Sequence, residues 1–297
     1  MEVSLQNSRI DSLKKPYQPF EIEVDVLRLD LIHPVISGNK WFKLQGHLNE
    51  AKEQTKKTII TFGGAYSNHL VATAAACQSA GLQSVGIVRG EMPQSLSHTL
   101  QDTAKFDMDL YFISRQDYTL KKIPDAVTQK YPADIYVVAE GGFGEKGSEG
   151  IADLLKESLA NYTHILASVG TGTTLAGLIS AASAEQKIIG ISALKGAFEL
   201  ADRINTLLPY HLQNNFTLLH DFHFGGYAKH TPQLLRFMND WFTQTGIPSD
   251  FVYTAKMFFA ADHLIRNQTF EHSSRLLLIH SGGLQGNRSL PEGTLIF

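Results

Sequence analysis

Short apolar runs alternate with amphipathic stretches along most of this chain. Residues 24–32 alternate apolar and polar positions, which is the pattern of a half-buried strand. Pro34 restricts the backbone of the residue before it, so we expect the strand to end there. Apolar residues then recur at helical spacing from Trp41 to Ala51, and an amphipathic helix is predicted to begin near Asn39.

From residue 58 the pattern becomes a regular alternation of strands and helices. Strands are predicted over residues 58–62, 84–88, 110–113, 134–139, 163–168, 188–191 and 216–220, and a last one begins at residue 276. Helices are predicted over residues 67–80, 95–106, 148–159, 175–184, 232–242 and 254–265. Because strands that alternate with covering helices pair in parallel, we predict an α/β fold with two lobes of open, twisted parallel sheet.

Three polar, glycine-rich turns separate a strand from a helix in this pattern. They are Ser37-Gly38-Asn39-Lys40, Gly63-Gly64-Ala65-Tyr66-Ser67-Asn68-His69 and Gly170-Thr171-Gly172-Thr173-Thr174. Such turns gather at the carboxyl edge of a parallel sheet, where open α/β proteins bind ligands. The three turns therefore predict one shared cleft.

Composition narrows the class of protein. With 297 residues, 43% of them hydrophobic, the chain can form two lobes with a substantial core. Its 26 basic and 29 acidic residues nearly balance, and there is no long basic run, so nucleic acid is not an expected partner. Neither a secretory signal nor a membrane span is visible, and a cytoplasmic location is expected by default.

Cysteine and histidine usage gives no indication of a metal site. The single cysteine, Cys77, lies in an alanine-rich run that predicts a buried helix face, and one cysteine excludes an internal disulfide. The spacing of His220, His223 and His230 matches no standard helical zinc motif. We therefore predict no metal.

The turn from Gly170 to Thr174 has the chemistry of a phosphate cradle. It follows a strand and opens a helix, so backbone N–H groups and the positive end of the helix dipole can hold a phosphate. It lacks the lysine of a nucleotide P-loop, and Leu175 stands where the dinucleotide fingerprint has its third glycine. A small phosphorylated cofactor is favoured, with a merely tight strand-to-helix turn as the alternative.

Lys40 and this cradle together are what pyridoxal 5'-phosphate requires. The lysine forms the Schiff base, and the cradle holds the phosphate at the other end of the cofactor. Taken alone, Lys40 would be interpreted as a solvated lysine near a helix start. The combination predicts pyridoxal 5'-phosphate as the cofactor and a small amino acid as the substrate.

The chain resembles the 1-aminocyclopropane-1-carboxylate deaminase and D-cysteine desulfhydrase family, of the tryptophan synthase β type. The resemblance extends from about residue 24 to residue 286 and rests on the three turns, on Val252-Tyr253-Thr254-Ala255-Lys256 and on His280-Ser281-Gly282-Gly283. We predict a large cofactor-binding domain of residues 1–44 and 162–297 and a small domain of residues 45–161, with the cofactor between them. A homodimer is also expected.

Position by position, the resemblance implies roles for five cleft residues. Lys40 would carry the cofactor and move a proton at the substrate α-carbon. Asn68 would bond the ring hydroxyl of the cofactor, and Ser281 would face its pyridine nitrogen. Ser67, Asn68 and His69, at the start of a helix, would hold the substrate and its carboxylate.

Three of the implied catalytic residues also have a simpler interpretation. Ser67 would donate or accept a proton, although a helix N-cap explains a serine there equally well. Tyr227 and Tyr253 match the two active-site tyrosines of the family, which stack near the ring and assist proton transfer, and Tyr227 would also contact the substrate. Simple aromatic packing is the alternative for both.

Two positions distinguish the subfamilies that the chain resembles. Ring-opening deaminases have glutamate where this chain has Thr254, and glutamine where it has His69. Both residues favour the D-cysteine desulfhydrase subfamily. Its reaction is a β-elimination that gives a 2-oxo acid and ammonia, with sulfide released when the substrate is D-cysteine. The alternatives left open are ring opening to 2-oxobutanoate, another eliminase or racemase, and a non-catalytic protein that binds pyridoxal phosphate or another phosphorylated metabolite.

Overall fold

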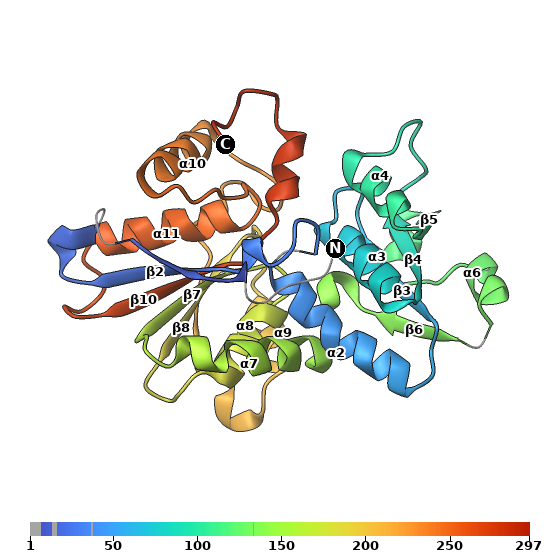
Figure 1. Cartoon of the computed structure of the whole chain (residues 1–297), viewed down its shortest axis with the longest axis horizontal. Coiled ribbons are helices and arrows are strands. Elements are labelled where there is room, and N and C mark those ends of the chain that lie inside the picture. The colour runs from blue at the N-terminus through green and yellow to red at the C-terminus, as the bar shows by residue number, and fades with distance from the viewer. Residues whose placement is uncertain (1–6, 14–16, 37, 133) are drawn as a thin grey trace.

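The computed structural model describes residues 7–13, 17–36, 38–132 and 134–297, and its strands form two separate sheets (Figure 1). The larger sheet has the order β1 (Ile10–Ser12), β2 (Glu23–Arg28), β10 (Arg275–His280), β7 (His164–Val169), β8 (Lys187–Ser192) and β9 (Thr217–Leu219). The smaller sheet has the order β5 (Asp109–Ile113), β4 (Gln83–Arg89), β3 (Thr58–Gly63) and β6 (Ile135–Val138). Every pairing in the described residues is parallel except β1 with β2, which confirms the predicted α/β class.

Helices connect these strands and cover the sheets. The α-helices are α2 (Asn39–Glu53), α3 (Asn68–Ala80), α4 (His98–Lys105), α5 (Arg115–Thr119), α6 (Asp125–Lys130), α7 (Glu145–Leu159), α8 (Thr173–Ala181), α9 (Leu200–Asn205), α10 (Pro232–Thr245) and α11 (Thr254–Arg266). Short 3₁₀ helices are η2 (Gln18–Phe20), η3 (Leu29–Leu31), η4 (Glu140–Gly142), η5 (Tyr210–Leu212) and η6 (Leu284–Ser289). Each predicted helix is present, and strand β1 and helices α5, α6 and α9 were not predicted.

Several predicted boundaries differ from the structure by two to four residues, and two of them differ for clear local reasons. The strand predicted over residues 24–32 ends at Arg28, where the chain enters η3. The prediction extended too far because Leu29 of η3 is buried and continues the alternation of apolar and polar positions. The helix predicted from residue 95 begins at His98. Ser97 is its N-cap, and its side chain accepts the backbone N–H of Leu100.

Helices pack on both faces of the larger sheet, with α11 on one face and α8 on the other (Figure 1). Neighbouring residues of β7 therefore point into two different cores. Ile165 packs in the cluster that contains Leu175 of α8, and Leu166 packs in the cluster that contains Phe258 of α11. A parallel sheet that is buried on both faces explains why this strand is an uninterrupted apolar run rather than an alternating one.

The smaller sheet is also covered on both faces. Ile59 packs in one cluster with Cys77 of α3, whereas Ile60 packs in another with Tyr118 of α5 and Val127 of α6. The prediction that Cys77 lies on a buried helix face is confirmed, and burial raises the pKa of its thiol to about 12. The thiol is therefore protonated and unreactive.

The strands of the two sheets are separated along the sequence. The smaller sheet lies within residues 58–138, and the larger sheet takes its strands from residues 10–28 and 164–280. The predicted domain limits fall in α2, at residue 45, and just after α7, at residue 161. These limits stay a prediction.

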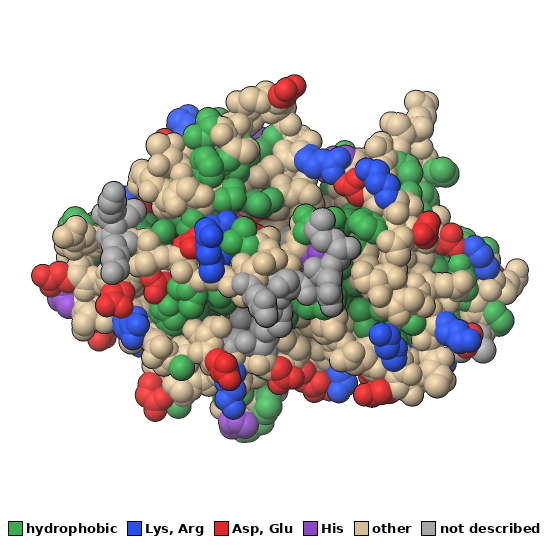
Figure 2. Space-filling model, viewed as in Figure 1, with side chains coloured by type: hydrophobic (Ala, Val, Ile, Leu, Met, Phe, Trp, Pro, Cys, Tyr) green, Lys and Arg blue, Asp and Glu red, His purple; other side chains and the backbone are tan. Residues whose placement is uncertain are grey.

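The surface carries charges of both signs. Figure 2 shows Lys and Arg side chains interspersed with Asp and Glu side chains over the visible face, with no broad area of one sign. In the described parts of the chain, no helix combines the length and the apolar composition needed to span a membrane. Within the same residues, no group of three or more His, Cys, Asp or Glu side chains is arranged to hold a metal ion.

Candidate active site

The lysine turn lies against the end of strand β10. A Cβ at Gly38, where φ is +66°, would be 1.8 Å from the carbonyl oxygen of Ser281, so only glycine fits. The backbone N–H of Asn39 donates to the same oxygen at 3.3 Å. Lys40, the second residue of α2, therefore lies beside the glycine turn that follows β10. Ser37, the first residue of the predicted motif, is outside the described residues.

The side chain of Asn39 connects Lys40 to the predicted phosphate cradle. Its Nδ2 donates to Oγ1 of Thr174 at 2.8 Å, and its Oδ1 accepts from Nζ of Lys40 at 3.1 Å. The lysine turn and the cradle thus lie together, although they are far apart in the sequence. Burial lowers the pKa of the Lys40 amine to about 8, against the opposing effect of the Asp250 carboxylate.

The cradle itself is the tight turn between β7 and α8. Gly172 has φ +95° and a Cβ there would be 2.7 Å from Ile204, so glycine is required. The hydroxyls of Thr171 and Thr173 lie 3.3 Å apart, and Thr173 is the first residue of α8. The turn therefore presents two hydroxyls beside the free N–H groups of a helix start, as a phosphate needs.

Lys43 belongs to this site and was missed as a functional residue from the sequence. It is 4% exposed, and among the described residues its Nζ reaches only the carbonyl oxygen of Gly141, at 3.5 Å. Gly141 in turn packs on Thr171 of the cradle, because its Cβ position is 2.6 Å from that side chain. Burial, with Lys40 and Arg203 nearby, holds the pKa of Lys43 well below its ordinary value. Its spacing of three residues from Lys40 on one helix face was the available signal.

The second turn places Ser67, Asn68 and His69 at the start of α3. Ser67 is the N-cap residue, but its hydroxyl makes no capping hydrogen bond, so the simple cap interpretation does not account for it. Asn68 donates from Nδ2 to the carbonyl oxygen of Gly283 at 3.5 Å, and its buried Oδ1 has no partner in the described residues. The amide therefore has an acceptor free for a bound molecule.

His69 is oriented by the interior of the small lobe. It is 3% exposed, and its Nε2 lies 2.8 Å from the hydroxyl of Thr61. Since that hydroxyl donates to the carbonyl oxygen of Val138 at 2.8 Å, it must accept from Nε2–H of His69. Burial keeps the pKa of His69 well below its ordinary value, so the ring is neutral. Its Nδ1 then carries a lone pair and no proton.

Tyr253 packs directly on the cradle. A Cβ at Gly170 would be 3.0 Å from the Tyr253 ring and 3.1 Å from its hydroxyl. The ring of Tyr227 stands edge-on to it, with 6.0 Å between centroids, and Tyr227 is 47% exposed. Burial of Tyr253, and the partial burial of the Tyr227 ring in the same contact, raise the pKa of both phenols, so both are neutral hydrogen-bond donors. The two predicted tyrosines therefore lie together above the cradle.

Asp250 holds Tyr253 in place and was also missed from the sequence. Its Oδ1 accepts the N–H groups of Val252 and Tyr253, at 2.9 and 2.8 Å. Its Oδ2 accepts the N–H of Thr254 at 2.9 Å and the hydroxyl of Thr254 at 2.7 Å. Burial raises the pKa of this carboxyl, and these hydrogen bonds oppose the rise. Four hydrogen bonds to one side chain hold the turn that leads into α11.

A family model described as "Pyridoxal-phosphate dependent enzyme" matches residues 20–282. The chain belongs to the pyridoxal-phosphate dependent enzyme family. Its cofactor is therefore pyridoxal phosphate, as the lysine turn and the cradle predicted.

Relatives within this pyridoxal-phosphate dependent family support the narrower resemblance. A Pyrococcus abyssi protein, provisionally named a 1-aminocyclopropane-1-carboxylate deaminase, is 29% identical over 89% of this chain and 86% of its own length. The bifunctional D-cysteine desulfhydrase/1-aminocyclopropane-1-carboxylate deaminase of Arabidopsis thaliana is 28% identical over 91% of this chain and 75% of its own. The D-cysteine desulfhydrase of Salmonella choleraesuis (strain SC-B67) is 23% identical over 88% of this chain and 87% of its own length.

A solved structure confirms the fold of this pyridoxal-phosphate dependent enzyme. The crystal structure of an ACC deaminase homologue superposes with a TM-score of 0.82 at 23% identity, over 97% of this chain and 92% of that one. The crystal structure of O-ureido-L-serine synthase superposes with a TM-score of 0.72 at 12% identity, over 97% of this chain and 94% of that one. The expected homodimer and cytoplasmic location stay predictions.

The residues at the cleft fit pyridoxal phosphate. A phosphate dianion suits the cradle and the buried amine of Lys43, which has no carboxylate partner in the described residues and would gain its charge beside a dianion. The unpaired Oδ1 of Asn68 suits a ring hydroxyl. The hydroxyl of Ser281, 3.4 Å from Oγ of Ser168 at the ends of β10 and β7, can face a ring nitrogen. These groups would otherwise be buried with poor or missing partners.

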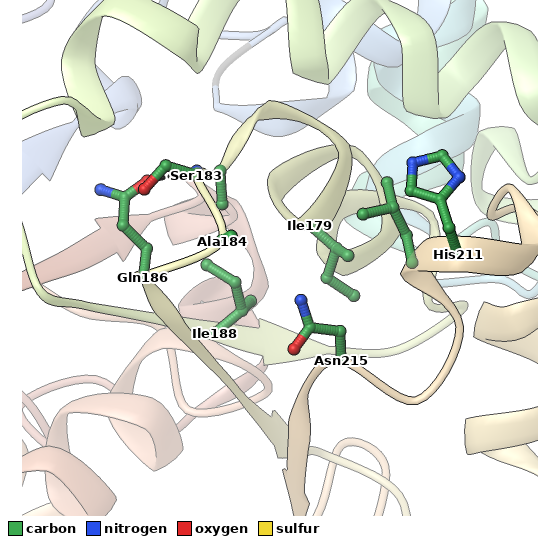
Figure 3. A pocket seen from close by; sticks show the side chains of 9 residues that line it. Ile179, Ser183, Ala184, Gln186, Ile188, His211 and Asn215 are labelled. Atoms are coloured by element: carbon green, nitrogen blue, oxygen red, sulfur yellow. Dashed lines mark hydrogen bonds between the residues drawn. The ribbon is translucent and has the colours of Figure 1, made fainter.

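A separate cavity of about 190 Å³ is not part of this site. It lies among Ile179, Ile188 and His211, at the opposite end of α8 from the cradle (Figure 3). None of the predicted site residues lines it.

Proposed function

We propose that this enzyme is a β-eliminating lyase of the D-cysteine desulfhydrase type. It would convert a small D-amino acid with a β leaving group into a 2-oxo acid and ammonia, with sulfide released from D-cysteine. When bound, pyridoxal phosphate acts as an electron sink that makes the α-proton of the substrate removable. The residues of the chain supply binding, orientation and proton transfer.

The surroundings of Thr254 are the observation that carries this proposal. The ring-opening deaminases that the chain resembles have a glutamate at this position, next to the tyrosine. Here the Thr254 side chain is fully buried, and its hydroxyl donates to Asp250 at 2.7 Å. This position therefore offers no acid to the cleft, which favours elimination over ring opening.

Lys40 is proposed to remove and return the proton at the substrate α-carbon. A pKa of about 8 lies near the working pH of most enzymes, and a base is most effective in that range. Tyr253 and Tyr227, whose raised pKa values keep their phenols protonated, would donate to the departing group. Lys43 and the cradle would hold the cofactor phosphate, Asn68 its ring hydroxyl and Ser281 its ring nitrogen.

The substrate carboxylate is proposed to bind at the start of α3. Its hydrogen bonds would come from the hydroxyl of Ser67 and the first N–H groups of the helix, where the dipole favours an anion. The neutral His69 ring gives its only proton to Thr61. We therefore assign to His69 the positioning of these N–H groups, and we assign the direct contact with the carboxylate to Ser67 and Asn68.

Two product assays on the purified holoenzyme test the proposal. Sulfide and pyruvate release from D-cysteine should exceed 2-oxobutanoate release from 1-aminocyclopropane-1-carboxylate. Borohydride reduction followed by peptide mapping should fix the cofactor to Lys40, and the variant Lys40→Ala should lose both activities. Faster ring opening than elimination would refute the proposed subfamily. Inactivity on both substrates would show that the enzyme is neither a D-cysteine desulfhydrase nor a 1-aminocyclopropane-1-carboxylate deaminase.

A further inference from the structure

An arginine without a counterion stands at the edge of the cleft. Arg89 is the last residue of β4, which pairs in parallel with β3, so its side chain leaves the sheet beside the turn that follows Gly63. Its Nη2 is 4.0 Å from the Cβ position of Gly64. Arg89 is exposed, and its side chain makes no ion pair or hydrogen bond within the described residues. Its guanidinium is therefore free to bind an anion.

Three further side chains, Tyr118, Lys121 and Glu140, lie between Arg89 and the cradle, and with Arg89 they form one wall. The Arg89 guanidinium lies 5.8 Å from the ring centroid of Tyr118, and Nζ of Lys121 lies 4.0 Å from the same centroid. Lys121 pairs with the carboxylate of Glu140 at 2.6 Å. Since Glu140 neutralises Lys121, the wall formed by Arg89, Tyr118, Lys121 and Glu140 retains one net positive charge.

The basic wall faces the tyrosines of the large lobe. Glu140 begins the turn whose next residue, Gly141, packs on Thr171 of the cradle. Arg89 and Lys121 both lie over the Tyr118 ring, and Lys121 pairs with Glu140, so these contacts lead from Arg89 to the cradle. The free charge of Arg89 thus lies on the cofactor side of the small lobe.

We propose that the basic wall binds an anionic group on the side chain of the substrate, with Arg89 as its direct ligand. The substrates would be amino acids that carry a second acidic group, such as a carboxylate or a phosphate. The thiolate of D-cysteine would be the weakest member of this class. This inference rests on the proposed function, because it assumes that an amino acid enters the cleft.

Matched pairs of amino acids test the assignment. The holoenzyme is titrated with aspartate against asparagine and with O-phosphoserine against serine, both enantiomers of each, and the change in cofactor absorbance gives the dissociation constants. We expect the charged member of at least one pair to bind about tenfold to a hundredfold more tightly, as expected for charge-assisted hydrogen bonds. The two pairs distinguish a carboxylate ligand from a phosphate ligand.

Single-residue variants test whether Arg89 causes the preference for the charged amino acid. Arg89→Met should abolish the preference and Arg89→Lys should keep part of it, whereas Glu140→Gln, which frees Lys121, should increase it. Arg236→Met removes an exposed charge from α10 and should change nothing. The inference is overturned if the wild type does not distinguish the pairs, or if Arg89→Met weakens both members equally. Sulfide release from D-cysteine in the same preparations reports separately on the proposed function.

Discussion

Lys40 and Lys43 lie one turn apart on α2, and burial lowers the pKa of both amines. Water solvates an ammonium better than a protein interior does, so a buried lysine tends toward its neutral form. The two residues differ in their partners, since Lys40 has the Asn39 amide and a distant carboxylate, whereas Lys43 has one carbonyl at 3.5 Å. The first arrangement suits a nucleophile and base, and the second suits a ligand for a dianion.

The pKa of Lys40 predicts how covalent cofactor binding depends on pH. The neutral amine is the reactive form, and a pKa lowered from 10.5 to about 8 makes it the major form above about pH 8. The rate at which apoprotein gains the absorbance of bound cofactor should therefore rise through pH 8 and level off above it. Stopped-flow mixing across pH 6 to 10 measures this, and a rate still rising steeply at pH 10 would contradict it.

At the scale of elements, the turn that carries Tyr227 is held by one buried lysine. Lys256 of α11 is fully buried, and its Nζ donates to the carbonyl oxygen of Gly226 at 2.7 Å. Within residues 224–228, Phe224, Gly225, Gly226 and Ala228 all have positive φ. A turn with so many residues in the left-handed region requires outside contacts to keep its shape.

Loss of this contact should loosen the turn without unfolding the protein. In Lys256→Met the Gly226 carbonyl keeps the backbone N–H of Lys229 but loses its charged donor, at a cost of about 1.5–3 kcal/mol. Limited trypsin digestion should then cleave after the exposed Lys229 roughly tenfold faster than in wild type, since cleavage follows the population of the open turn. The control is Lys187→Met, which removes an exposed lysine paired with Glu271. Equal cleavage of Lys256→Met and wild type would mean that Lys256 does not restrain the turn.

The sequence pattern predicted which elements meet but not which side chains lack partners. Lys40 and Thr174 were placed together because parallel strands end at one edge of a sheet, and the structure joins them through Asn39. Lys43 and Asp250 were missed, since their importance follows from burial and from contacts across the fold. Strand β1 was missed because three residues are too few for a period-two pattern to show.

At the scale of the whole molecule, the two lobes meet through helices and through contacts across the cleft. Helices α2 and α7 cross so closely that the Cβ position of Gly46 is 2.4 Å from the carbonyl oxygen of Lys146. On the other side of the cleft, Arg288 of η6 pairs with Asp102 of α4. Exposed ion pairs contribute little to stability. The helix crossing is therefore the contact that fixes α2, and with it Lys40, against α7.

A second glycine at this crossing, Gly150 of α7, allows a test of whether the crossing sets the geometry of the site. Alanine normally stabilises a helix interior by about 0.5–1 kcal/mol relative to glycine. A Cβ at Gly150 would be 2.2 Å from the carbonyl oxygen of Phe42, so Gly150→Ala must push α2 away from α7 and move Lys43 relative to the cradle. We expect a lower free energy of unfolding and weaker binding of pyridoxal phosphate, measured by urea denaturation and by cofactor titration. Gly286→Ala, whose Cβ position meets its nearest atom only at 3.7 Å, should leave both within error. If Gly150→Ala proves as stable as wild type with unchanged cofactor affinity, the crossing does not set the geometry of the site.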